Sequence, residues 1–305
     1  MLMKATKVFI FATCLSTATA TEPCTNLSAQ QLLSLRGKVT ALRHLALLFE
    51  LFLPVNWDPS HTHPVITFLH GRGESGGFDV TNAQSLPLQL ISNASAIATC
   101  PFIVIIPQCP VNCMRYNSWL PSVLQDVTAL LHEWVCAFAG GDPRRLYLAG
   151  QSMGGHGAWI FAAQQARLFA ALVVVCGYAQ GDDEATTIAS RLSRQKMPVL
   201  IYHSVDDSVI PVDAADQMVA ALHRGGYRTD EAQGAENENG PRVPRLKYVR
   251  YDHAPGPPMP EFSHLIGHGS YELAFRDAEL YRWLLRQQCA KCSKPRAPWS
   301  SLREA

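Results

Sequence analysis

A short glycine-rich turn at residues 150–154 limits the possible folds of this chain more than any other segment. Its sequence is Gly150-Gln151-Ser152-Met153-Gly154, and it joins an apolar run expected to be a strand at 145–149 to a segment expected to be a helix at 154–167. On such a tight turn, glycines beside a serine avoid collisions with neighbouring backbone, and the hydroxyl is exposed at a helix N-terminus, where negative charge is stabilised. A chance glycine-rich turn is the alternative, but the strand-to-helix placement favours a nucleophilic Ser152.

The rest of the chain continues this alternation of strands and helices. Several of the expected strands are nearly continuous apolar runs, as in parallel strands that are buried on both faces. The other strands are expected at 45–53, 65–69, 102–106, 171–176, 199–203 and 246–251. The other helices are expected at 120–138, 184–195, 214–224 and 271–288. This order predicts the α/β class, with a mostly parallel central sheet and helices on both faces.

The N-terminal residues have the features of a secretory signal peptide. Lys4 and Lys7 precede an apolar run at 8–15, and Ala18-Thr19-Ala20 supplies the small residues at which signal peptidases cleave. A membrane anchor is the alternative, but it needs about 20 apolar residues, and no other stretch is long enough either. We therefore predict a signal peptide at 1–20 and a secreted protein without an integral membrane segment in its mature chain.

The 305 residues are enough for one large domain with short additions at both ends. We expect a catalytic domain at 21–290, followed by a basic, disordered tail at 291–305. Residues 228–245 are dominated by Gly, Pro, Asn and Glu, and this composition predicts a surface insertion.

Nine cysteines are present, and removal of the signal peptide with Cys14 leaves eight. An even number in a secreted chain predicts disulfide bonds. Cys289 and Cys292 form a C-x-x-C pair, but the chain has no second ligand pair at metal spacing and no thioredoxin-like strand-then-helix setting, so we predict no metal site. Cys136 and Cys176 lie in apolar segments and are expected to be buried thiols or structural bridges.

A serine hydroxyl needs a base to take its proton and an acid to orient that base. The expected strand 199–203 leads to Asp206 and Asp207, and neighbouring residues of an extended segment point to opposite sides, so only one faces the base. We predict Asp207, which leads directly into Ser-Val-Ile-Pro, and assign Asp206 to turn hydrogen bonds. The acidic residues 182–184 are an alternative, although they suit the start of the next helix better.

The base is expected in a loop just before the last helix. Gly267-His268-Gly269-Ser270 fits, because the glycines let the loop bring His268 toward Ser152, and Ser270 can cap the helix. His253 and His264 compete from the same stretch, but neither lies between glycines at a helix entry.

An oxyanion hole in a site of this kind pairs two backbone N–H groups. One is the N–H after the nucleophile, here Met153, and for the other we predict the N–H of Arg72 in the glycine-rich loop at 70–77. That loop contains no phosphate-binding glycine pattern. Gln108 and Trp119 follow the expected strand 102–106 and are predicted to line the acyl or alcohol pocket, because ligands bind beyond the carboxyl ends of parallel strands. For the aromatic ring of Trp119, packing is an equal alternative.

Together these motifs resemble the α/β-hydrolase superfamily of serine esterases, in the branch that holds phospholipase/carboxylesterase-type, feruloyl-esterase-type and predicted-peptidase enzymes. The resemblance covers residues 45–288 and rests on Leu51–Pro54, Leu69–Glu74, Pro107–Pro110 with Trp119, Gly150–Gly155, Asp207 before Val209-Ile210-Pro211, and Gly267–Ser270. It implies ester hydrolysis through an acyl-enzyme, with a Ser152-Asp207-His268 triad and without a metal or cofactor. The signal peptide is atypical of the cytosolic thioesterase members, and the insertion at 228–245 has no counterpart among them.

Two other functions stay open at this point. A serine peptidase is compatible with the same scaffold, although a site without a gating domain favours esters. A secreted binding protein that had lost its chemistry would have a broken triad, whereas every element is present here. The formal net charge of +1 gives no case for binding nucleic acid or an anionic membrane. The expected partner is therefore a small-molecule, lipid or polymer ester.

Overall fold

The computed structural model describes residues 22–77, 86, 89, 98–165, 167–229 and 244–292. The predicted signal peptide lies outside the described residues, as do most of the insertion at 228–245 and most of the tail at 291–305. The limits of the catalytic domain at 21–290 therefore stay a prediction.

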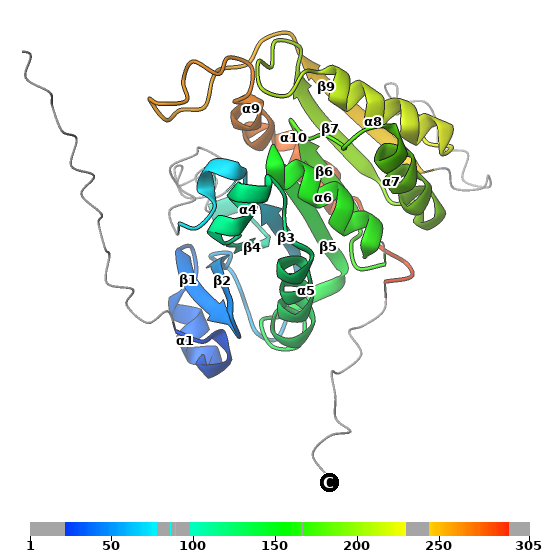
Figure 1. Cartoon of the computed structure of the whole chain (residues 1–305). Helices are drawn as coiled ribbons and strands as arrows, with labels where there is room; N and C mark the ends of the chain where they lie inside the picture. The colour runs from blue at the N-terminus through cyan, green and yellow to red at the C-terminus, as the bar shows by residue number, and fades with distance from the viewer. Residues whose placement is uncertain are drawn as a thin grey trace, which may run out of the picture.

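A nine-stranded sheet forms the centre of the molecule, in the order β1-β2-β4-β3-β5-β6-β7-β9-β8 (Figure 1). Its strands are β1 (Val39–His44), β2 (Leu47–Phe52), β3 (His63–Leu69), β4 (Ile103–Pro107), β5 (Gly141–Gln151), β6 (Ala171–Val175), β7 (Val199–Ser204), β8 (Arg228–Thr229) and β9 (Arg245–Tyr251). β2 pairs antiparallel with β1 and with β4, and the other pairs are parallel. The prediction of a mostly parallel sheet is confirmed.

The sequence analysis missed the two strands at the edges of the sheet, β1 and β8. β1 reads Val-Thr-Ala-Leu-Arg-His and pairs with β2 over all six residues, but its polar side chains interrupt the apolar run that marks a central strand. β8 has only two residues, both exposed. Edge strands of this kind are short and polar, so they lack a distinct pattern.

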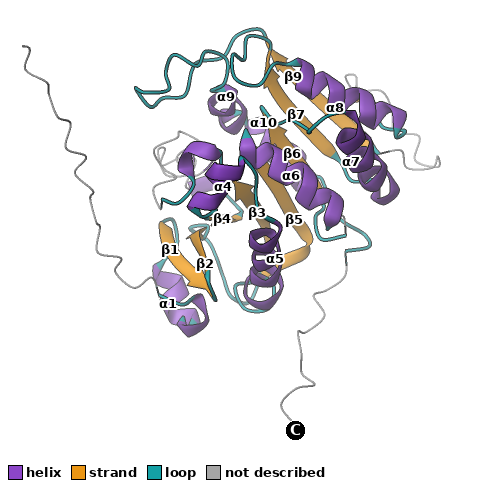
Figure 2. Cartoon of the chain, in the orientation of Figure 1, coloured by secondary structure: helices purple, strands orange, loops and turns teal. Residues whose placement is uncertain are grey.

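Helices cover both faces of the sheet (Figure 2). They are α1 (Ala29–Ser34), α4 (Val111–Tyr116), α5 (Pro121–Leu130) with a π-helical continuation (Leu131–Val135), α6 (Met153–Gln164), α7 (Asp182–Gln195), α8 (Asp213–Arg224), α9 (Ser270–Arg276) and α10 (Ala278–Leu285). Successive side chains of β5 point to opposite faces. Leu146 and Leu148 join the apolar cluster under α5 to α8, whereas Tyr147 and Ala149 join the cluster under α9 and α10. The two-faced arrangement predicted for the sheet is therefore confirmed.

The prediction of one continuous helix at 271–288 is wrong, because α9 ends at Arg276 and α10 begins at Ala278. Asp277 lies between them in an extended conformation, and its side chain caps α10 by accepting a hydrogen bond from the N–H of Glu279. The hydroxyl of Tyr202 on β7 also donates to the Asp277 carboxylate at 2.9 Å. An aspartate with these two partners is more stable as a cap than inside a helix.

Two disulfide bonds occur in the described chain, Cys109–Cys113 and Cys289–Cys292. The expectation of disulfides is therefore confirmed, and the C-x-x-C pair is one of them. Cys136 and Cys176 are free thiols, of which Cys176 is fully buried and Cys136 is half-buried. Among the described helices, none combines the length and the apolar character needed to cross a bilayer.

Candidate active site

Ser152 lies on the turn between β5 and α6, at the carboxyl edge of the parallel strands. Its φ of 53° and ψ of −122° are strained for a residue with a side chain, and its N–H donates to Val175 on β6 at 3.0 Å. The flanking glycines are required by contact: a Cβ at Gly154 would lie 2.0 Å from the carbonyl oxygen of Leu69, and one at Gly150 would lie 2.2 Å from that of Gly154. Glycine is thus required at both positions because β3, β5 and α6 approach one another closely.

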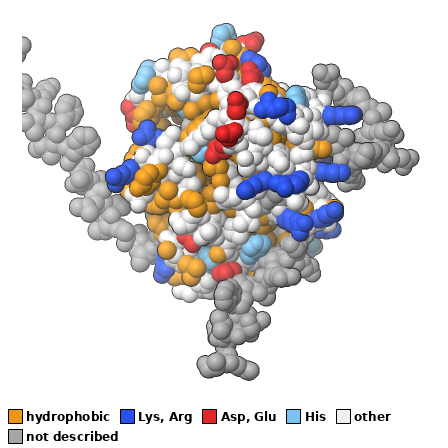
Figure 3. All heavy atoms as spheres, turned by 45° about the vertical axis from the view of Figure 1, so that its right-hand side comes forward, with side chains coloured by type: hydrophobic (Ala, Val, Ile, Leu, Met, Phe, Trp, Pro, Cys, Tyr) orange, Lys and Arg blue, Asp and Glu red, His pale blue; other side chains and the backbone are white. Residues whose placement is uncertain are grey.

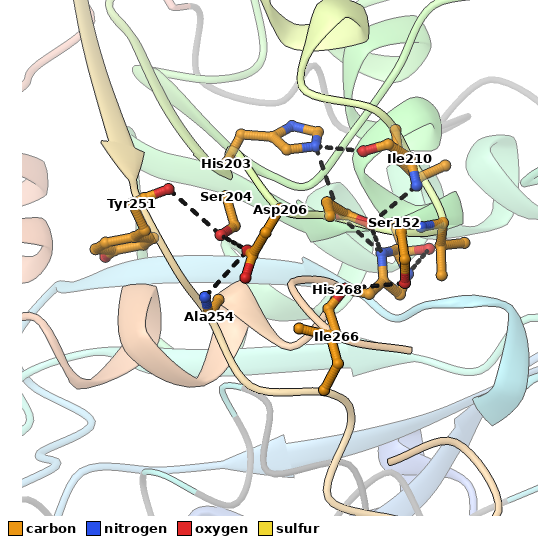
Figure 4. A network of polar contacts seen from close by, with 12 residues as sticks. Ser152, His203, Ser204, Asp206, Ile210, Tyr251, Ala254, Ile266 and His268 are labelled. Carbon is orange, nitrogen blue, oxygen red and sulfur yellow. Dashed lines mark hydrogen bonds and ion pairs between the residues drawn. The ribbon is translucent and has the colours of Figure 1, made fainter. Parts of the chain in front are cut away.

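The loop after β7 directs its two aspartates to opposite sides. Asp207 is buried, and its Oδ1 accepts hydrogen bonds from the N–H groups of Val209 and Ile210, both at 2.9 Å. Asp206 accepts hydrogen bonds from the hydroxyl of Ser204 and from the N–H of Ala254 (Figure 4). The geometry therefore turns Asp207, and not Asp206, toward the interior of the site.

His268 bridges Ser152 and Asp207. Its Nε2 lies 3.0 Å from Ser152 Oγ, and its Nδ1 lies 3.0 and 3.1 Å from the two carboxylate oxygens of Asp207 (Figure 4). Gly267 lets the loop reach this position, because its φ is +82° and a Cβ there would lie 2.4 Å from the backbone of Asp206 and Asp207. Ser152 and Asp207, the other two members of the predicted triad, are thus each within hydrogen-bond distance of the His268 ring.

The competing histidines lie elsewhere. His253 is exposed and lies 3.3 Å from Asp206. His264 is exposed as well. The expectation that Ser270 caps the last helix is wrong, because Gly269 is the N-cap of α9 and Ser270 is its first residue. The acidic residues 182–184 form the first turn of α7, as their favourable interaction with a helix N-terminus predicts.

The charge of Asp207 is stabilised by its partners. Burial raises the pKa of this carboxyl group, but hydrogen bonds from His203 and His268 and the charge of His268 outweigh it and hold the pKa well below its usual range. His203, which the sequence analysis did not single out, lies fully buried on β7, with Nε2 2.8 Å from the carbonyl oxygen of Ile210 and 3.4 Å from Asp207. No local sequence pattern marks it, because its contact with Asp207 depends on how the turn after β7 folds back.

Arg72, the residue predicted to be the second oxyanion donor, lies in the loop after β3. The N–H of Arg72 belongs to the peptide group whose oxygen is that of Gly71, and His70 Nδ1 lies 2.8 Å from that oxygen. His70 Nε2 accepts a hydrogen bond from the N–H of Cys109 at 3.0 Å, so Nδ1 carries the proton and donates. Burial lowers the pKa of His70 to about 4, which keeps the ring neutral. One buried histidine thus fixes the orientation of the Arg72 peptide group.

Gln108 and Trp119 are both buried and hold this same loop. The indole N–H of Trp119 donates to the carbonyl oxygen of His70 at 3.1 Å, and the ring packs against the imidazole with the two centroids 5.0 Å apart. Gln108 Nε2 donates to the carbonyl oxygen of Glu74 at 2.7 Å. Both residues thus support the loop after β3, and their predicted contact with substrate stays a prediction.

One group of side chains in the described chain has the donor atoms for a metal ion: Cys176, Asp207 and His268 lie with their ligand atoms within 4.8 Å of one another. Asp207 and His268 already share hydrogen bonds. Burial raises the pKa of the Cys176 thiol, so it is protonated at neutral pH and a poor metal ligand. The donor set therefore suits an imidazole and carboxylate pair better than a metal.

The charged surface lies away from this site. Lys and Arg side chains gather on the face toward α7 and α8 (Figure 3). A hollow of about 430 Å³ near the C-terminal ends of α6 and α7 is lined by Arg167, Arg191 and Arg194. Arg194 lies in the last turn of α7, where a positive side chain is favourable.

Comparisons with known proteins agree with this geometry. The family model "Putative esterase" matches residues 46–224, more than half of the chain. That range contains Ser152 and Asp207, whereas His268 lies beyond it. A search by sequence among curated proteins finds no match.

Solved structures of esterases share the fold. A thermostable esterase is similar with a TM-score of 0.58 and 23% identity, over 82% of this chain and 62% of that one, so the chain spans less than two thirds of its length. Est1E from Butyrivibrio proteoclasticus has a TM-score of 0.53 and 13% identity, over 81% and 97% of the two chains. A mutant feruloyl esterase module from Clostridium thermocellum, complexed with sinapinate, has a TM-score of 0.51 and 15% identity, over 75% and 82%. The chain therefore has the fold of these hydrolases.

Proposed function

Since the chain belongs to the esterase family and has the α/β-hydrolase fold, we propose that it hydrolyses carboxylic esters through an acyl-enzyme formed on Ser152. The observation that carries the proposal is the distance of 3.0 Å between Ser152 Oγ and His268 Nε2, with Asp207 on the other nitrogen of the same ring. In this arrangement Ser152 can act as the nucleophile, His268 as the base and Asp207 as the acid that orients the base.

In the first half-reaction, His268 Nε2 takes the proton of Ser152 as Oγ attacks the ester carbonyl carbon. The negative charge that develops on the carbonyl oxygen is held by the N–H groups of Met153 and Arg72. His268 then gives its proton to the leaving alcohol, and the acyl group stays on Ser152. In the second half-reaction a water molecule takes the place of the alcohol and releases the acid.

Asp207 stabilises the imidazolium that forms in both steps. Its two N–H partners and His203 favour the ionised carboxylate, so the negative charge stays next to His268 Nδ1 throughout the reaction. An ionised partner at Nδ1 also keeps the proton on that nitrogen, which leaves Nε2 free to act as the base.

We also propose that the protein is secreted after removal of residues 1–20, with the catalytic domain at 21–290. The two disulfide bonds support an oxidising compartment. The N-terminal sequence of the protein recovered from the medium of a eukaryotic expression host tests the cleavage site.

The function is tested by labelling the purified protein with a fluorophosphonate probe, beside Ser152→Ala. Wild-type protein is expected to be labelled and to hydrolyse short p-nitrophenyl esters, and Ser152→Ala is expected to lose labelling and about 10⁴-fold or more in kcat. Peptide p-nitroanilides in the same panel separate ester from peptide hydrolysis. Folded wild-type protein that neither reacts with the probe nor hydrolyses an ester would exclude the proposed chemistry.

A further inference from the structure

Glu74 is a carboxylate beside the Arg72 peptide that the mechanism above does not use. It is the third residue of a 3-10 turn, Arg72–Glu74, whose N-cap residue is Gly71. Its carboxylate lies beside Gly71, since a Cβ at Gly71 would meet Glu74 Oε2, and the nearby N–H groups of Gly71 and of Glu74 itself favour the ionised form. A glutamate at the third position of a turn has the placement of a capping-box residue, whose carboxylate faces the N–H of the N-cap residue.

The same side chain reaches the strand that carries the nucleophile. Gln151, the last residue of β5 and the neighbour of Ser152, donates from Nε2 to Glu74 Oε1 at 3.3 Å. The space is narrow, since a Cβ at Gly71 would lie 2.9 Å from Glu74 Oε2 and 3.7 Å from the Cβ of Ser152. One carboxylate therefore joins the turn of Arg72 to the strand of Ser152.

We propose that Glu74 is a positioning residue for ester hydrolysis, which holds the N–H of Arg72 in register with Ser152 so that both meet the same substrate carbonyl. The inference rests on the proposed function. Turning the Arg72 N–H away requires rotation of the Gly71–Arg72 peptide group, whose oxygen His70 holds. The Glu74 carboxylate lies against Gly71 itself, on the N-terminal side of the same peptide group. With both contacts present, the peptide group has a single orientation, and an oriented donor is what oxyanion stabilisation needs.

The location of Glu74 also argues against a role in stability alone. Burial raises the pKa of its carboxyl group to about 7, so the ionised form is costly at this depth. An uncharged side chain of similar size would satisfy packing. The ionised carboxylate, in contrast, offers two acceptor oxygens, one to the turn and one to Gln151.

The test compares Glu74→Gln, Gln151→Met and the double variant Glu74→Gln with Gln151→Glu. In Glu74→Gln only one side-chain acceptor oxygen remains, so the amide cannot serve the turn and Gln151 together, and kcat is expected to fall by about 10- to 100-fold with little change in KM. The double variant exchanges amide and carboxylate across the same contact and is expected to recover most of this loss. Gln151→Met removes the contact while keeping Glu74, and is expected to lower kcat by about 10-fold. Glu279→Gln on α10 is the matched control for loss of a carboxylate elsewhere.

A pair of substrates separates positioning from general damage to the fold. Replacing the carbonyl oxygen of a p-nitrophenyl ester by sulfur weakens its hydrogen bonds to oxyanion donors, so the wild-type protein is expected to prefer the oxygen ester strongly. Glu74→Gln is expected to reduce this oxygen-to-sulfur rate ratio by about 5-fold or more, because one donor is already misaligned. A purely structural defect would lower both rates by the same factor.

The outcomes separate the two proposals. If Ser152→Ala abolishes turnover but Glu74→Gln and Gln151→Met keep the wild-type kcat and oxygen-to-sulfur ratio, the positioning role of Glu74 is wrong and the proposed function stands. If Glu74→Gln does not fold, an unchanged ratio in folded Gln151→Met has the same meaning. If Ser152→Ala keeps full activity, the proposed function itself is wrong.

Discussion

The two sides of this site are built in different ways. On the proposed acid–base side, Ser152 and Asp207 follow β5 and β7, His268 lies in a loop, and all three are proposed to act through their side chains. On the proposed oxyanion side, the donors are the backbone N–H groups of Arg72 and Met153. The first side needs three side chains of the right chemistry, and the second needs a peptide group held in one orientation.

This difference determines where supporting residues lie. Asp207 receives N–H donors from its own turn, at Val209 and Ile210, so the acid–base side is held mainly by local contacts. The Arg72 turn is held from other segments, through Cys109 bound to His70 and Gln151 bound to Glu74. A backbone donor thus depends on more distant parts of the chain than a catalytic side chain does.

The largest difference in kcat is expected between substitutions of two neighbouring carboxylates, Asp207 and Asp206. Asp207→Asn replaces an acceptor of the His268 Nδ1 proton by an amide that donates, which favours the wrong tautomer, and kcat is expected to fall by about 10³- to 10⁴-fold. Asp206→Asn keeps an oxygen for the N–H of Ala254 and is expected to change kcat by less than about 5-fold. The measurement is kcat of both variants on one p-nitrophenyl ester. Equal losses would contradict the assignment of Asp207.

The acid–base side was largely predictable from the sequence because its signals are local. The strand-turn-helix setting of Ser152, the turn after Asp207 and the glycines around His268 each lie within a few residues of the side chain that they place. The central strands were predictable for a similar reason, since burial on both faces leaves a continuous apolar run.

The oxyanion side was predictable only in part. The glycine-rich loop marked Arg72, but His70 and Glu74 act through contacts with residues 39 and 77 positions further along the chain, and no local pattern reports such contacts. The break of the last helix at Asp277 is a similar case, because its bond with Tyr202 spans 75 residues. Tertiary contacts decided these features, and helix periodicity alone misses them.

The pH dependence of stability is expected to distinguish His70, which supports the Arg72 turn, from Asp207 on the acid–base side. Burial lowers the pKa of His70 to about 4, below its unfolded value near 6.5, so the unfolded chain binds a proton over a range where the folded protein does not. Stability is therefore expected to fall as the pH drops from 6.5 to 4, by about 3 kcal/mol from this residue. The pKa of Asp207 is held low, so its contribution is present above about pH 4 and is lost only as the pH falls below that value.

Urea unfolding between pH 7 and pH 3 measures both effects. In His70→Gln, the free energy of unfolding is expected to depend less on pH between 6.5 and 4, while the decline below pH 4 remains. In Asp207→Asn, the decline below pH 4 is expected to be smaller, while the dependence between pH 6.5 and pH 4 remains. A pH dependence between 6.5 and 4 that is the same in His70→Gln as in the wild-type protein would contradict the neutral, buried state of His70.

The smallest effect is expected at His203, which lies on β7 and supports Asp207 through its imidazole. His203→Phe keeps the ring in its buried position on β7 but removes the N–H that lies 3.4 Å from Asp207, so the carboxylate is held less firmly against His268. Because this contact is long and shared with the carbonyl oxygen of Ile210, kcat is expected to fall by only about 10-fold. The exposed His264→Phe is the control and is expected to keep the wild-type kcat. A loss at His203 as large as that of Asp207→Asn would show that the acid–base side also depends on a distant support, and the contrast between the two sides would then disappear.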